Sequence, residues 1–196
     1  GATATSLCQT ISEQWPDVSM PLETCEPRMV VDGLMFHNDE GEEKLIPAVW
    51  HGIDEGRVDR VWMPEDDCCS GRLASADDEI VLDEHAASGM EIGIGDTISI
   101  GAGHGRMNFT VVGIGYHSQH LYFSQMGSIL PADPGTFATG YLSDTGIERL
   151  ANLSAGSANF LLLDVAGSPE YDLQSTEEDE GERLSEIISS IKDIMM

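Results

Sequence analysis

Basic residues are scarce in this chain of 196 residues, which has 9 Lys+Arg against 35 Asp+Glu and a formal net charge of -26. Nucleic acids and anionic lipids are bound through basic contacts, so this composition argues against both as partners. Lys44 and Lys192 are the only lysines. Two interpretations of the acidity stay open: a habitat of concentrated salt, which screens self-repulsion, and an acidic interaction face.

The chain also lacks a long apolar run, because no stretch approaches the roughly 18 residues that a membrane span needs. It begins at Gly1 without a preceding Met and stops at Met196 within a helical pattern. We therefore expect a piece of a longer protein, with any signal or membrane segment outside it. Hydrophobic residues make up 41% of the chain, enough to form a core.

Signatures of catalysis are missing as well. No Gly-x-Ser-x-Gly occurs, and the glycine-rich stretch 91–115 lacks the Gly-Lys-Ser/Thr ending of a phosphate loop. That stretch also leads into strands rather than a helix, so its glycines predict hairpin turns. His117-x-x-His120, with His104, lies in predicted loops and is weak evidence for a metal site. We expect no enzyme activity, no cofactor and no bound metal.

The four cysteines include no Cys-x-x-Cys pair, which argues against a shared zinc site. Three pairings are possible, and the sequence does not choose among them. In an oxidising exterior we expect at least one disulfide, with Cys8 and Cys25 as candidates, while four ordinary thiols remain the alternative. The glycosylation sequons at Asn108 and Asn152 matter only for an extracellular protein. The cysteines are Cys8, Cys25, Cys68 and Cys69.

The spacing of hydrophobic residues predicts the helices and strands of the chain. Trp50 and Trp62 are expected in the core or at a subdomain interface. Residues 54–63 could form one or two helical turns, and a short helix over 83–88 is expected to end at Gly89. The order of elements predicts an α+β fold. We expect helices over 3–15, 144–153 and 184–195, and strands over 28–36, 44–53, 79–82, 96–100, 107–114 and, as a buried strand, 158–165.

The central stretch resembles the extracytoplasmic domain of ABC transporter permeases of the MacB/FtsX/LolC type. In that family a Gly-Arg pair is followed by an acidic residue and a strand, a short helix, a Gly-Asp turn and a Phe-x-Val-Val-Gly-Ile strand. Here residues 71–72, 79–83, 92–96 and 109–114 match that series. We assign structural roles to Gly71, Arg72, Asp83, Gly89, Gly95, Asp96, Phe109 and Gly113.

The resemblance implies an α/β subdomain near the membrane, built from residues 1–50 and 152–196, with a smaller β-rich subdomain, residues 51–151, inserted into it. It implies a place on the extracytoplasmic face of the cell membrane, extracellular or periplasmic, anchored by flanking transmembrane helices absent from this fragment.

The function implied is non-catalytic. The domain would transmit movement driven by a cytoplasmic ATPase subunit or domain, or engage an exported substrate or an accessory protein. Its partners would be the transmembrane helices of the same permease and a second permease copy. The alternative is a free-standing secreted or surface-exposed binding module. We expect a partner-contact loop formed by His117, His120, Leu121, Tyr122, Phe123 and Met126.

Overall fold

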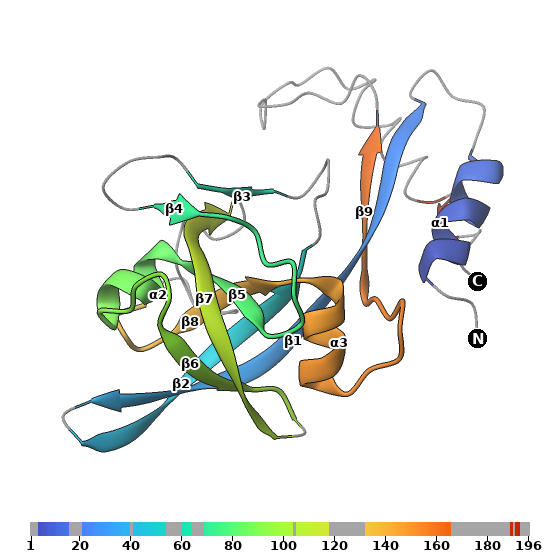
Figure 1. The fold of residues 1–196 in the computed structure, drawn as a ribbon. Coiled ribbons are helices and arrows are strands. Elements are labelled where there is room, and N and C mark those ends of the chain that lie inside the picture. The colour runs from blue at the N-terminus through green and yellow to red at the C-terminus, as the bar shows by residue number, and fades with distance from the viewer. Residues whose placement is uncertain are drawn as a thin grey trace. The chain divides into compact units, whose positions relative to one another are not determined.

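A computed structural model describes residues 4–15, 21–39, 41–53, 60–63, 69–103, 105–117, 132–165, 189 and 191–192. The fold is α+β, as the sequence predicts. Figure 1 shows the helices α1 (Ala4–Glu13), α2 (Glu84–Gly89) and α3 (Asp144–Ala151), with the strands β1 (Leu22–Asp39), β2 (Glu42–Gly52), β3 (Val61–Trp62), β4 (Ser70–Gly71), β5 (Glu79–Asp83), β6 (Thr97–Gly101), β7 (Arg106–His117), β8 (Ala138–Leu142) and β9 (Phe160–Val165).

The chain falls into two compact units. The terminal unit comprises residues 1–27 and 161–196, and the middle unit comprises residues 28–160. The sequence instead suggested subdomain boundaries at 50/51 and 151/152. Residues 28–50 fall in the middle unit because they pair with strands from later in the chain.

The strands of the middle unit form a closed circuit. β1 pairs antiparallel with β2 along one edge and with β6 along the other. From β2 the hydrogen-bonded order continues through β8, β5 and β7 to β6, which returns to β1. The β2–β8 and β5–β7 pairs are parallel, and the others are antiparallel. The middle unit is therefore a small β-barrel.

Side chains fill the barrel, as is usual at this size. Met35, Ile100 and Phe109 are each 1% exposed or less. Trp50 is fully buried, which confirms its predicted core position, and its Nε1 donates to the Gly101 carbonyl oxygen at 3.2 Å. Gly33 leaves room for that indole, since a Cβ there would lie 2.3 Å from Trp50 Nε1. The strand predictions for 28–36, 44–53, 96–100 and 107–114 are confirmed.

Trp62 is 64% exposed, so of the two positions expected for it, the core or a subdomain interface, the core is wrong. The expected helical turn is also replaced by a strand at Val61–Trp62, while residues 54–59 lie outside the described part. Successive strand side chains face opposite sides. Val61 packs toward Tyr141, so Trp62 faces away and contacts the ring of Tyr116, with centroids 6.3 Å apart.

The helix α3 confirms the prediction for residues 144–153. Ser143 caps its start, and its Oγ accepts the Gly146 N–H at 3.1 Å. Asn152 ends it in the left-handed region at φ 52°, a conformation that asparagine tolerates. Ile147 and Leu150 are each 1% exposed and join the core cluster.

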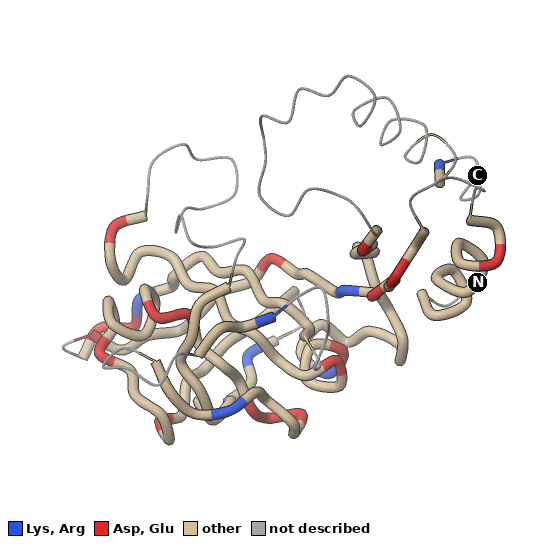
Figure 2. The backbone as a smooth tube through the Cα atoms, turned by 90° about the horizontal axis from the view of Figure 1, so that it is seen from above, with Lys and Arg blue, Asp and Glu red and all other residues tan. Residues whose placement is uncertain are grey.

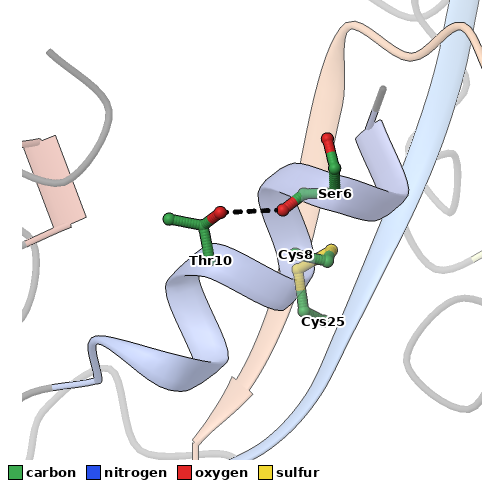
Figure 3. Close-up of a disulfide and its surroundings, with 4 residues drawn as sticks. All are labelled: Ser6, Cys8, Thr10 and Cys25. Carbon is green, nitrogen blue, oxygen red and sulfur yellow. Dashed lines mark hydrogen bonds between the residues drawn. A yellow bond between two sulfur atoms is a disulfide. The ribbon is translucent and has the colours of Figure 1, made fainter. Parts of the chain in front are cut away.

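In the terminal unit, α1 confirms the predicted N-terminal helix, and Ile11 is fully buried. Figure 3 shows the disulfide that joins Cys8 of α1 to Cys25 of β1, with Cα atoms 5.6 Å apart. Thr10 Oγ1 donates to the Ser6 carbonyl oxygen within the same helix. The pair that the sequence offered as a candidate disulfide is therefore bonded, and Cys69 is disulfide-bonded as well.

The strand β9 confirms a strand within residues 158–165, but it is not buried as expected: Phe160 is 51% exposed and the rest is half-buried. β9 is the last strand in the pairing order, after β1. Among the described strands, β9 therefore has a partner along one edge only. The predicted helix 184–195 lies outside the described residues except at 189, 191 and 192.

Among the described residues, the acidic ones are spread over several elements and turns (Figure 2). Within the part of the chain that the structure describes, no helix has the length and apolarity required to cross a membrane.

Candidate functional site

The Gly-Arg pair of the central motif forms an ionic junction at the start of β5. The guanidinium of Arg72 holds the Glu79 carboxylate through both nitrogens, with Nη1 2.7 Å from Oε2. The same carboxylate accepts the backbone N–H groups of Ser75 and Ala76 at 3.0 and 3.1 Å. These hydrogen bonds, led by the one from Arg72, hold the pKa of Glu79 far below its ordinary value of 4.5. The junction fixes the turn between β4 and β5.

Gly71 and Gly113 let β4 approach β7 closely. The two glycines are partners in the β4–β7 register. A Cβ on Gly113 would lie 2.5 Å from the Arg72 carbonyl oxygen, and one on Gly71 would lie 2.4 Å from the Val112 carbonyl oxygen. Gly71 also has φ +101°, which L side chains rarely adopt. Both motif glycines are therefore required by backbone contact.

The Gly-Asp turn of the motif attaches the segment before β6 to β7. Gly95 has φ +95°, as its place in a turn predicts. Its N–H donates to the Val111 carbonyl oxygen at 2.8 Å, and Val111 N–H donates to the Asp96 carbonyl oxygen at 2.9 Å. The Asp96 carboxylate accepts the Gly93 N–H at 2.8 Å, so it bonds backward along the chain.

The helix α2 ends at Gly89, as the sequence predicts, and Gly89 itself is still helical. The left-handed residue is Glu91, at φ 54°, beyond the cap residue Met90. Gly89 instead allows close contact with another turn, since a Cβ there would lie 2.6 Å from Gly135 N. Phe109 fills the core, as the motif predicts, and is 1% exposed.

A buried polar cluster lies where β2, β5, β7 and β8 end, and sequence reasoning missed it. Its members His51, Asp83, His117 and Tyr141 are each 4% exposed or less. Tyr141 Oη donates to Asp83 Oδ2 at 3.2 Å, and its ring centroid lies 5.6 Å from that of His51 and 5.4 Å from that of His117. The nearest signal in the sequence was Asp83, assigned only to the start of α2.

Asp83 also begins α2, as its motif role predicts. Its Oδ1 accepts the His85 N–H at 3.0 Å and lies 3.0 Å from His85 Nδ1. Burial raises the pKa of the Asp83 carboxyl, while the contacts with His85 and Tyr141 act in the opposite direction. The hydrogen bonds of Asp83 to His85 and Tyr141 join α2 to β8.

His117 was expected in an exposed contact loop, but its side chain is 1% exposed. It is the last residue of β7, and it stacks on His51 with ring centroids 5.9 Å apart. The other residues of that predicted loop, His120, Leu121, Tyr122, Phe123 and Met126, lie outside the described residues. Among the residues that are described, no group of three or more His, Cys, Asp or Glu side chains is placed to hold a metal ion.

Comparison with known proteins gives structural similarities alone. No family model and no curated protein matches the chain. The chain is similar to the crystal structure of the periplasmic region of MacB from Actinobacillus actinomycetemcomitans, with 16% identity, a TM-score of 0.46, and coverage of 95% of this chain and 74% of that one. It is also similar to a domain of a protein assigned as a permease from Porphyromonas gingivalis, with 13% identity, a TM-score of 0.42, and coverage of 94% and 69%.

Proposed function

We propose that this chain is a non-catalytic extracytoplasmic domain of an ABC transporter permease of the MacB/FtsX type. The observation that carries the proposal is the arrangement of the motif residues. Arg72 and Glu79, the Gly71–Gly113 contact and the Gly95–Asp96 turn all attach to β7 or to the turn before β5. Residues that match the family in sequence thus form one connected framework, and a framework of this kind keeps a module rigid.

A rigid module suits a mechanical role. Movement of the membrane helices can reach an outer surface only through parts that do not deform. In this proposal a separate cytoplasmic ATPase hydrolyses ATP, and the domain transmits the resulting movement or engages an exported substrate or accessory protein. Its other partners would be the transmembrane helices of the same permease and a second permease copy.

The disulfides support a place outside the cytosol. Cys8 is bonded to Cys25, and Cys69 is also disulfide-bonded. Disulfides persist in oxidising compartments and are rare where thiols are kept reduced. An extracellular or periplasmic location fits this chemistry, and flanking transmembrane helices would provide the anchor.

The first test is to read the coding region on both sides of this fragment. We expect an apolar run of about 20 residues shortly before Gly1 and another shortly after Met196. A signal peptide before Gly1 together with a stop codon after Met196 would overturn the proposal. The chain would then be a free-standing secreted binding module.

A second test addresses the mechanical role in the full-length permease with its ATPase. Arg72→Lys removes the bidentate ion pair with the Glu79 carboxylate but keeps the positive charge at position 72. We expect it to uncouple transport from ATP hydrolysis while the basal ATPase rate stays unchanged. The matched control is Arg60→Lys, which makes the same change at an exposed position away from this junction. Equal transport by both variants would argue against a coupling role for the framework.

A further inference from the structure

A groove of about 460 Å³ opens in the barrel wall where the β1–β6 ladder stops. The pairing of β1 with β6 runs from Leu34–Gly101 to Phe36–Ser99. The same register, continued, would place Asn38 opposite Thr97. Those two residues are not paired with each other, and both line the groove.

The turn after α2 lines the groove as well, through Met90, Glu91 and Ile92. The N–H groups of Met90 and Ile92 donate to carbonyl oxygens of α2 at 3.2 and 2.9 Å, which fixes the turn. The segment before β6 is bonded to β7 through Gly95 and Asp96. Because both segments are tied to other elements, the groove belongs to the folded barrel and does not require a loop to move.

Among the described residues, each of the two strand ends that flank the groove has a partner strand along one edge only. β1 pairs with β2 as far as Asp39, and β6 pairs with β7 from Thr97 onward. Residues 37–38 and 97–98, which lie beyond the last β1–β6 pair, line the groove. A strand edge of this kind offers backbone N–H and C=O groups to a further strand.

The side chains of the groove combine an apolar floor with an acidic rim. Met35, Met90 and Ile98 line it and are 6% exposed or less. The carboxylates of Glu91 and Asp96 lie on exposed residues that also line it.

The one arginine that lines the groove is already engaged. Arg106 forms an ion pair with Glu43, donates to Ser99 Oγ at 2.6 Å and lies over the ring of Phe36. Glu43 neutralises the positive charge of Arg106. The carboxylates of Glu91 and Asp96 then leave the groove with a negative charge, which favours a cationic ligand.

We propose that this groove binds an extended peptide segment of a partner protein that carries a basic side chain. The segment adds a short strand to β1 at residues 37–38 and to β6 at residues 97–98. One of its apolar side chains rests on Met35 and Ile98, and its basic group lies near Glu91 and Asp96. The inference goes beyond the proposed function, because it rests on the groove alone and holds for a permease domain or a secreted module.

Binding is tested on the full 196-residue chain with a fluorescein-labelled hexapeptide, Thr-Val-Lys-Val-Thr-Val, followed by fluorescence anisotropy at low salt. A second peptide with Glu in place of Lys is the matched probe. We expect the Lys peptide to bind at least about tenfold more tightly than the Glu peptide, because like charges on an exposed rim repel where opposite charges attract.

Glu91→Lys tests the rim, and Asp133→Lys is its control, since it makes the same charge change at an exposed residue that does not line the groove. We expect Glu91→Lys to weaken the Lys peptide about fivefold or more and Asp133→Lys by less than about twofold. Equal weakening by both variants would overturn the proposed site, because it would indicate attraction to the net charge of the chain alone.

Amide hydrogen exchange followed by NMR tests the mode of binding. Addition of a strand should slow exchange at amides within residues 37–38 and 97–98. Failure of the Lys peptide to bind at millimolar concentration, or binding that leaves those amides unprotected, would overturn the proposal. Neither outcome bears on the permease assignment, which the flanking coding region tests separately.

Discussion

A Cβ added to Gly113 would lie 2.5 Å from the Arg72 carbonyl oxygen, whereas one added to Gly95 would meet nothing within 4 Å. The two motif glycines are therefore needed for different reasons. Gly113 is needed for space between backbones, and Gly95 is needed for its positive φ.

This difference predicts an order of stability. Gly113→Ala should lower the free energy of unfolding by about 3 kcal/mol, because the contacted atom is backbone and cannot move aside cheaply. Gly95→Ala should cost about 1 kcal/mol, from φ alone. Urea denaturation followed by circular dichroism measures both. A larger loss in Gly95→Ala than in Gly113→Ala would contradict this account of the β4–β7 contact.

Glu79 predicts a pH dependence. Its pKa is depressed in the folded state, so its contribution to stability is present above the unfolded value near 4.5 and is lost as pH falls toward the folded value. We expect Glu79→Gln to cost about 1–2 kcal/mol at pH 7. The difference from wild type should stay constant above about pH 5 and shrink steadily from pH 4.5 to pH 3.

Urea denaturation at each pH, with Glu42→Gln as the control for an exposed acid, measures that effect. A gap between wild type and Glu79→Gln that stays constant down to pH 3 would show that the carboxylate of Glu79 contributes through packing rather than through its charge.

At the scale of elements, the residue that follows the C-cap of α2, Glu91, adopts a left-handed conformation that glutamate does not favour. Glu91 occupies the left-handed position where glycine is usual, and the glycine of this stretch, Gly89, remains inside the helix. The contact of Gly89 with Gly135 fixes the helix against another turn. The helix therefore ends at the predicted glycine, while the left-handed conformation falls on Glu91.

Glu91→Gly should raise the free energy of unfolding by about 1 kcal/mol, because it removes the left-handed strain of a side-chain-bearing residue. Thermal unfolding measures the gain. Asn, which tolerates the same conformation, should give a smaller gain at this position. A destabilised Glu91→Gly would mean that the Glu91 side chain makes a contribution to folding that outweighs the backbone strain.

At the scale of the whole molecule, the Cys8–Cys25 disulfide constrains the terminal unit. Replacing both cysteines by serine should lower the stability of that unit by about 3 kcal/mol, the loop-closure value for a loop of about this length. Amide exchange should accelerate in α1 and stay unchanged in β5 and β7. Equal acceleration in both regions would contradict the division into two units.

The net charge of -26 predicts a salt dependence. Screening of self-repulsion should raise the melting temperature by about 5 °C between 0.1 M and 2 M KCl. Potassium chloride is preferable to a sulfate salt, because sulfate strengthens apolar burial regardless of charge. An unchanged melting temperature would favour the other interpretation of the acidity, an acidic interaction face.

Much of the secondary structure could be predicted because its signals are local. The four-residue spacing of Leu7 and Ile11 predicts α1, and the β-branched residues around Val111 predict β7. The motif also placed Arg72 before Glu79, although their ion pair became visible only in the structure. Trp62 was misplaced, because the type of a side chain does not show which face of a two-residue strand it occupies.

The sequence by itself determined the periodic elements, the turns that need glycine and the acidic surface, since each depends on neighbours a few residues apart or on composition. Only the tertiary structure decided the closure of the barrel through β1 and β6, the groove where that pairing stops and the bond between Tyr141 and Asp83. The Tyr141–Asp83 hydrogen bond and the β1–β6 pairs connect residues that lie 58 or more positions apart in the sequence. Their partners are chosen by packing of the whole chain, which no local pattern encodes.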